Sequence, residues 1–246
     1  MFQSMLRTLL LLLLVASTCE SGFAHTPFEF LEVLKVSPAN VVEHSLELQT
    51  KFDNSRTDTA LVGPELFARS VGCLGRSAKK ASTYLSWYRI ASPKQEPNRL
   101  ITVLDLVRGS ENMDLSISTA EYFLSPTQQV ESGPPDAVPT GVDHYTAYKV
   151  INAPAVKLSV EITGANGSES RQVAKPLFVC VATEEWHHDE YFATSHPRAC
   201  IVVYQLDASE AEFRVNTLDQ FGLNQLQSQS SNWLGVRGTL LGSNAE

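Results

Sequence analysis

The stretch Asp143-His144-Tyr145-Thr146-Ala147-Tyr148-Lys149-Val150 decides the fold, because its second half recurs along the chain. The recurrences end at positions 36, 90, 150 and 206, so the intervals are 54, 60 and 56 residues. A steady interval of this size is typical of a duplicated structural unit. The four copies are Leu34-Lys35-Val36, Tyr88-Arg89-Ile90, Tyr148-Lys149-Val150 and Tyr204-Gln205-Leu206.

Each copy opens a segment in which apolar and polar residues alternate, as in residues 46–52 and 100–107. Alternation with period two indicates half-buried β-strands, and helical periodicity is almost absent. Each unit reads as strand, turn with Pro or Asp, strand, tight turn and strand. One such unit cannot cover both faces of its own sheet. The sequence therefore predicts an all-β fold of four weak β-repeat units, paired into two sandwich- or barrel-like domains.

The recurring triplets also predict burial. In a strand the first and third residues of each triplet share one face, and the middle residue points to the other face. We therefore expect the eight outer positions to be buried and the middle positions to be exposed. The middle positions are Lys35, Arg89, Lys149 and Gln205.

A stretch rich in Pro and Gly, residues 132–142, separates the second unit from the third. Proline cannot donate a backbone hydrogen bond, so this stretch is excluded from the interior of a sheet. It reads as a linker between a first repeat pair, residues 25–131, and a second pair, residues 143–246. We expect these two halves to fold independently.

Residues 1–24 have the pattern of a signal peptide. Arg7 precedes an apolar run at residues 9–16, which is too short for the roughly 20 residues of a membrane span, and small residues precede His25. An alternative is a lipoprotein signal in which Cys19 is lipidated. The expected location is therefore outside the cell, in the periplasm or on the cell surface, with no transmembrane segment in the mature chain.

The formal net charge is −8, from 27 acidic and 19 basic residues. A nucleic-acid backbone would be repelled, so the charge argues against nucleic acid as a partner. The expected partner is an extracellular ligand or an envelope component of unknown identity.

Three cysteines follow the signal segment. Cys180 and Cys200 are close in sequence, and an oxidising compartment would favour a disulfide between them, which leaves Cys73 over. The alternative is that all three are buried thiols.

The segment 186–190 carries the best candidates for a metal site. Imidazoles and carboxylates ligate zinc and similar ions, and His187, His188 and His196 could act together in a metal-dependent hydrolase. The alternative is a solvated loop, because the spacing fits no helical His face. No nucleophile elbow is present, so the sequence predicts no catalytic residue and no cofactor.

Trp186 is the candidate ligand-binding residue. It is expected in a loop beside charged residues, whereas the other aromatic residues fall in strands, where packing is the usual role. A flat exposed ring of this kind can stack on the face of a sugar.

Three segments resemble a bacterial extracellular repeat domain of unknown function. They are residues 144–150, residues 174–180 and Asp219-Gln220-Phe221-Gly222. Members read approximately His-aromatic-x-Cys-Tyr-Lys, then Asp-Gln-Phe-Gly, then Lys-Pro-x-x-Leu-Cys, and often occur as paired copies in secreted proteins.

This chain departs from that pattern at three points. Ala147 and Val203 stand where the family has cysteine, and Gly164-Ala165-Asn166-Gly167 replaces the Asp-Gln-Phe-Gly turn in the third unit. The family's disulfides are therefore not carried over, and it supplies no catalytic residue. The resemblance implies a secreted or cell-envelope, non-enzymatic β-repeat protein that serves as a structural or binding module.

Overall fold

The computed structural model describes residues 26–78, 84–131, 139–164 and 167–245, and this part of the chain contains strands, turns and loops but no helix. The all-β prediction is confirmed. The strands are β1 (Phe30–Pro38), β2 (Val42–Thr50), β3 (Thr57–Ser70), β4 (Gly72–Cys73), β5 (Tyr84–Ile90), β6 (Arg99–Asp105), β7 (Met113–Val130), β8 (His144–Asn152), β9 (Leu158–Gly164), β10 (Gly167–His187), β11 (Glu190–Phe192), β12 (Ala199–Glu210), β13 (Arg214–Asp219) and β14 (Gly222–Ala245).

The predicted signal segment and Cys19 lie outside the described residues. No described segment forms a helix with the length and apolar character needed to cross a bilayer.

Each repeat unit consists of an opening strand, a second strand and a third strand that forms a hairpin with the second. The hairpins are β2–β3, β6–β7, β9–β10 and β13–β14, all antiparallel. The opening strands are β1, β5, β8 and β12, and each contains one of the recurring triplets. The four-unit interpretation of the sequence therefore agrees with the order of the strands.

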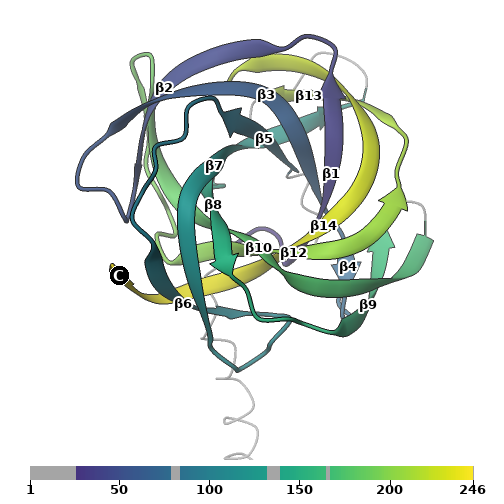
Figure 1. Cartoon of the computed structure of the whole chain (residues 1–246). Helices are drawn as coiled ribbons and strands as arrows, with labels where there is room; N and C mark the ends of the chain where they lie inside the picture. The colour runs from purple at the N-terminus through teal and green to yellow at the C-terminus, as the bar shows by residue number, and fades with distance from the viewer. Residues whose placement is uncertain (1–25, 79–83, 132–138, 165–166, 246) are drawn as a thin grey trace, which may run out of the picture.

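Opening strands and third strands alternate around a closed ring of antiparallel pairs, seen end-on in Figure 1. The ring runs β1–β14–β12–β10–β8–β7–β5–β3 and returns to β1. It is irregular, because the long third strands bend out of it to pair with second strands.

The strand pairing differs from the two-domain organisation that residues 132–142 suggested. Each second strand pairs with a third strand, or its short continuation, two units further on: β2 with β10, β6 with β14, β9 with β4 and β13 with β7. Every one of these pairs joins the first half of the chain to the second half. The two halves therefore share one sheet, and the linker does not divide the strands into two separate sets.

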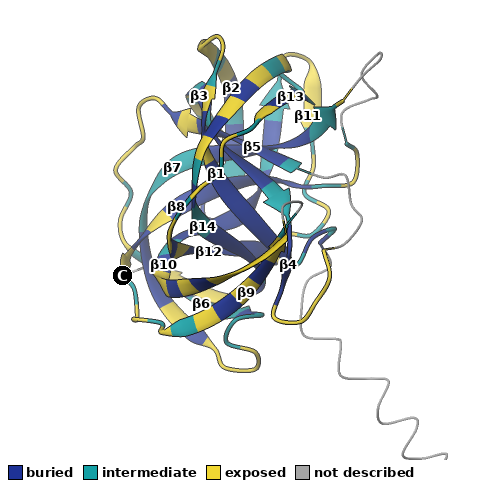
Figure 2. Cartoon of the chain, turned by 90° about the vertical axis from the view of Figure 1, so that its right-hand side faces the viewer, coloured by how far each residue is buried: buried dark blue, intermediate teal, exposed yellow. Residues whose placement is uncertain are grey.

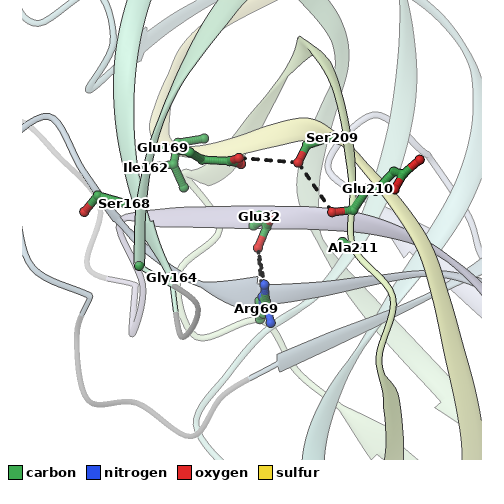
Figure 3. Close-up of a pocket in the computed structure, with 10 residues that line it drawn as sticks. Glu32, Arg69, Ile162, Gly164, Ser168, Glu169, Ser209, Glu210 and Ala211 are labelled. Atoms are coloured by element: carbon green, nitrogen blue, oxygen red, sulfur yellow. Dashed lines mark hydrogen bonds and ion pairs between the residues drawn. The ribbon is translucent and has the colours of Figure 1, made fainter.

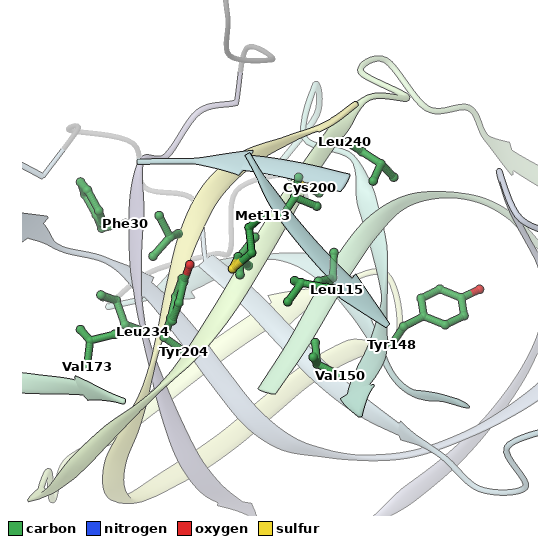
Figure 4. Close-up of a cluster of buried hydrophobic side chains, with 14 of the residues drawn as sticks. Phe30, Met113, Leu115, Tyr148, Val150, Val173, Cys200, Tyr204, Leu234 and Leu240 are labelled. Atoms are coloured by element: carbon green, nitrogen blue, oxygen red, sulfur yellow. The ribbon is translucent and has the colours of Figure 1, made fainter. Parts of the chain in front are cut away.

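The ring strands are buried on both faces, as the blue interior of Figure 2 illustrates. One apolar cluster contains inward residues such as Leu31, Trp87 and Tyr145. The largest outer cluster, drawn in Figure 4, lies between the ring and the second strands β6 and β9, and includes Tyr148 and Tyr204. This second layer explains why the opening strands contain nearly continuous apolar runs.

The burial predicted for the recurring triplets is confirmed. The first residues of the triplets are at most 1% exposed and the third residues at most 9% exposed. All four middle residues are exposed. The four triplets therefore present the same two faces.

The predicted disulfide between Cys180 and Cys200 is not formed. Cys180 is paired in register with Ile201, and Cys200 with Val181. Because neighbouring residues of a strand point to opposite faces, this offset of one residue sends the two thiols into different clusters. Cys73, Cys180 and Cys200 are all buried free thiols, which was the alternative interpretation.

We expect Gly238→Ala to lower the free energy of unfolding by about 1–3 kcal/mol, the usual cost of overpacking. A Cβ atom at Gly238 would lie 2.9 Å from the Leu104 carbonyl oxygen and 3.0 Å from Cys200 Sγ. Gly242→Ala on the same strand is the matched control, because nothing lies within 4 Å of its added Cβ. Urea unfolding measures both, and equal stabilities would show that the close approach at Gly238 does not matter.

Candidate functional site

The segment that carried the metal and ligand predictions is a β-hairpin. Trp186 of β10 pairs with Tyr191 of β11, and His187 pairs with Glu190, so His188 and Asp189 form a two-residue turn. His188 has φ 54°, a conformation that tight hairpin turns use at their first position. The local sequence is thus explained by turn geometry.

The three predicted metal ligands do not form a cluster. The rings of His187 and His188 have centroids 4.2 Å apart, whereas His196 lies beside Asp143, with 3.5 Å between Nδ1 and Oδ2. Asp143 also accepts hydrogen bonds from the backbone amides of Ser195 and His196. Within the described ranges, no three His, Cys, Asp or Glu side chains are placed to bind a metal ion.

Trp186 stands in a row of side chains that crosses four strands. Its direct neighbours across the sheet are Glu47 on β2 and Tyr191 on β11, and Glu47 is paired in turn with Asp58 on β3. Tyr191 stacks on the indole at 4.8 Å, and the Arg56 guanidinium lies 3.9 Å over it. Arg56 also bonds Glu47 at 3.2 Å.

A groove of about 600 Å³ lies beside this row. Its lining includes the small side chains Ser45, Ala60 and Ser92, together with Trp186 and His188. Ser45 and Ala60 are paired two residues from Glu47 and Asp58 and therefore share their face. The small residues leave a hollow that the Trp186 row borders.

The tyrosines of the recurring triplets make equivalent hydrogen bonds across the molecule. The Tyr88 hydroxyl donates to Asp219 Oδ2 at 2.6 Å, and the Tyr204 hydroxyl donates to Asp105 Oδ2 at 2.5 Å. Each aspartate is the last residue of the second strand of the unit opposite, and its other oxygen accepts hydrogen bonds from backbone amides of the turn that follows. Burial raises the pKa of the Asp219 carboxyl to about 6, and the hydrogen bond from Tyr88 acts in the opposite direction.

The third tyrosine, Tyr148, is linked to an aspartate of the opposite unit through the hydroxyl group of a threonine. Tyr148 and Thr50 have hydroxyl oxygens 3.0 Å apart, and Thr50 Oγ1 donates to Asp53. Because the single hydroxyl hydrogen of Thr50 goes to Asp53, the Tyr148 hydroxyl is the donor to Thr50. Asp53 follows β2, the second strand of the unit opposite. The repeated Tyr and Asp positions therefore join opposite units.

A buried polar network lies at one end of the ring. Glu185, which is fully buried, accepts a hydrogen bond from Gln220 Nε2 at 2.5 Å and lies 3.5 Å from His144 Nδ1. Burial raises the pKa of Glu185 to about 8 and lowers the pKa of His144 to about 3. Near neutral pH this pair is therefore uncharged.

We expect Glu185→Gln to flatten the pH dependence of stability above pH 6.5. The pKa of Glu185 rises from 4.5 to about 8 on folding, so its stabilising contribution is lost as the pH rises towards 8. The pKa of His144 falls from 6.5 to about 3 on folding, so this group makes stability rise with pH only below pH 6.5. Above pH 6.5 it adds nothing to the slope. The unmodified protein should lose up to about 1.4 kcal/mol per pH unit there. Urea unfolding from pH 6.5 to 8.5 measures this, and parallel curves for the two proteins would contradict it.

A second cavity, of about 150 Å³, lies beside β1, the end of β9 at Gly164 and the start of β10 (Figure 3). Glu32 and Arg69 form a buried ion pair at its wall, with Arg69 Nη2 2.7 Å from Glu32 Oε2. The rest of the lining comes from the β9–β10 hairpin and from residues 209–211. The sequence does not predict this cavity; its one sign there is the charged Glu32 between the apolar Leu31 and Val33 of β1.

A family model matches residues 84–237, which is more than half of the chain. It describes a repeat of unknown function, DUF7450. This chain belongs to the DUF7450 family. Comparisons with curated proteins and with solved structures give no significant match.

The DUF7450 match begins at the first residue of β5 and ends within β14, so it covers units two to four. Unit one lies outside it and yet has the same strand plan. Inside the matched region, Asp219 and Gln220 are the residues that hold Tyr88 and Glu185. These DUF7450 positions therefore serve to connect repeat units in this protein.

Proposed function

We propose that the protein is a secreted or cell-envelope, non-enzymatic binding module, and that it binds its ligand in the groove beside Trp186. The observation that carries this proposal is the position of Trp186. It borders the groove of about 600 Å³ together with hydroxyl and carboxylate side chains. Concave sites of this volume, with an aromatic surface and a few polar groups, are suited to ligand binding.

A non-enzymatic role is supported by where the strongly perturbed acid–base groups lie. Glu185, His144 and Asp219 are at most 6% exposed and are bonded within the fold. A general acid or base must come within hydrogen-bond reach of its substrate, and burial at these positions prevents that. Their shifted pKa values are explained by packing of the repeat units.

The groove favours an uncharged polyhydroxylated ligand, such as a neutral polysaccharide. The indole offers an apolar surface to a sugar ring, and the Glu47 and Asp58 carboxylates accept hydrogen bonds from hydroxyl groups. The same carboxylates would repel an anionic chain. Arg56 now covers part of the indole and is half exposed, so a ligand can displace it.

Affinity electrophoresis in gels that contain neutral or acidic polysaccharides tests the proposal. We expect a neutral polysaccharide to retard the protein and Trp186→Ala to weaken this retardation at least tenfold. Leu100→Ala, which removes an exposed apolar side chain on β6, should leave it unchanged. Retardation that is equal for the Trp186 variant, or seen only with acidic chains, would refute the assigned groove and ligand class.

A further inference from the structure

One of the four contacts between opposite units lacks both the tyrosine and its hydrogen-bond acceptor. In unit one, Leu34 stands where the other units have tyrosine. Its partner should come from the opposite unit, unit three, at the end of β9. There the chain has Gly164, the last residue of β9.

The register confirms that Gly164 occupies the aspartate position. The contact between Tyr204 and Asp105 serves as the reference. There Asp105 is paired with Gly238, and Gly238 is paired with Cys200, which lies four residues before Tyr204. In unit one, Phe30 lies four residues before Leu34 and accepts the amide of Val71. β4 pairs Gly72 with Thr163, so one further antiparallel step places Gly164 beside Val71. This contact therefore has neither the tyrosine nor the aspartate.

The cavity of about 150 Å³ lies at this lost contact. Gly164 lines one side and Glu32, two residues before Leu34 on the same face, lines the other. Figure 3 shows Glu32 and Arg69 between Gly164 and the segment that carries Ser209 and Glu210. Two copies of the contact hold a phenol and a carboxylate, and a third holds the Tyr148 phenol and the Thr50 hydroxyl, whereas this copy is hollow and bordered by the Glu32–Arg69 ion pair.

The ion pair presents one acceptor and one donor. Arg69 Nε and Nη2 both contact Glu32 Oε2, at 2.8 and 2.7 Å. Both contacts are made to the same carboxylate oxygen, Oε2. Arg69 is also held over the Phe213 ring, at 4.9 Å. The Glu32 side chain is only 7% exposed, so the pair is fixed in position before any ligand binds.

We propose that this cavity binds a small zwitterion of the size of a simple amino acid. A carboxylate would bind Arg69, and an ammonium group would bind Glu32, assisted by Glu210 at the rim. One water occupies about 30 Å³ in the liquid, so a cavity of this volume holds about five non-hydrogen atoms. Glycine has this size and carries both charges. The site is separate from the Trp186 groove and does not depend on the function proposed for it.

Nuclear magnetic resonance with glycine as the probe tests the proposal. We expect glycine to shift the amide signals of Glu32, Gly164 and Ser209, and acetate and methylamine, which carry one charge each, to bind at least tenfold more weakly. Glycine should be tested up to about 100 mM, where a millimolar site is filled. No shift at these residues, or equal shifts with acetate or methylamine, would overturn the proposal.

Gly164→Asp supplies the matched variant, because it introduces at the cavity the aspartate that units two and four have at this position. The nearest atom to an added Cβ is Arg69 Nη2 at 3.9 Å, so the substitution has room. We expect at least tenfold weaker glycine binding, with the unfolding transition retained. Gly242→Asp, at an open position on β14, should bind glycine normally. Unchanged binding by a folded Gly164→Asp protein would place the glycine site elsewhere.

Discussion

Neither half of this protein should fold when it is produced alone. In residues 25–131, strands β1, β2 and β6 each lose one of their partner strands, which are β14, β10 and β14 of the other half. Residues 143–246 lose β7, which pairs with both β8 and β13. Two apolar clusters contain residues of both halves. Each fragment alone would therefore expose to water the apolar side chains that the other half covers.

Circular dichroism and urea unfolding of the two fragments measure this outcome. We expect each fragment alone to lack a cooperative transition, and the mixture to regain part of the signal of the intact chain because the missing strands can pair again. The intact chain, cleaved within residues 132–138 after folding, is the control for chain continuity. Two separately cooperative fragments would restore the two-domain interpretation of the sequence.

Tyr148→Ala should lower the free energy of unfolding by about 3–5 kcal/mol, the range for large aromatic deletions in a core. Tyr148 is 1% exposed, packs edge-on against Phe52 at 5.4 Å, and donates to Thr50. The variant loses the buried ring and one link between opposite units. Tyr148→Phe keeps the ring and should cost only about 0.5–1.5 kcal/mol, the net value of one hydrogen bond.

Lys149→Ala is the matched control on the neighbouring residue. Lys149 points to solvent and pairs with Glu121 at 3.1 Å, an exposed ion pair of little energetic value. We expect a loss below about 0.5 kcal/mol. Urea melts of the three variants give the comparison, and a larger loss for Lys149 than for Tyr148 would contradict the equivalence of the four triplets.

The local pattern could be predicted from the sequence because it depends on strand geometry alone. Period two fixes which residues share a face, so the triplets at Leu34, Tyr88, Tyr148 and Tyr204 reveal both the strands and their burial. The repeat interval gives the number of units. The charged Glu32 and the glycine at position 164 can also be seen in the sequence. Without the strand register, however, the sequence does not show that these two residues lie close together.

The tertiary structure decided which units touch. Each second strand pairs with the unit two further on, and such long-range pairing leaves no local signal that distinguishes it from pairing with an adjacent unit. A proline-rich stretch likewise predicts only that its own residues do not join the interior of a sheet. It does not predict whether the strands before it pair with the strands after it, and in this protein they do. Register alone separated Cys180 from Cys200, since an offset of one residue reverses the face. The sequence by itself determined the four repeated units, because strand periodicity is local. Glu32, Arg69 and Gly164 come from distant parts of the chain, so only the closure of the ring brought them to one cavity.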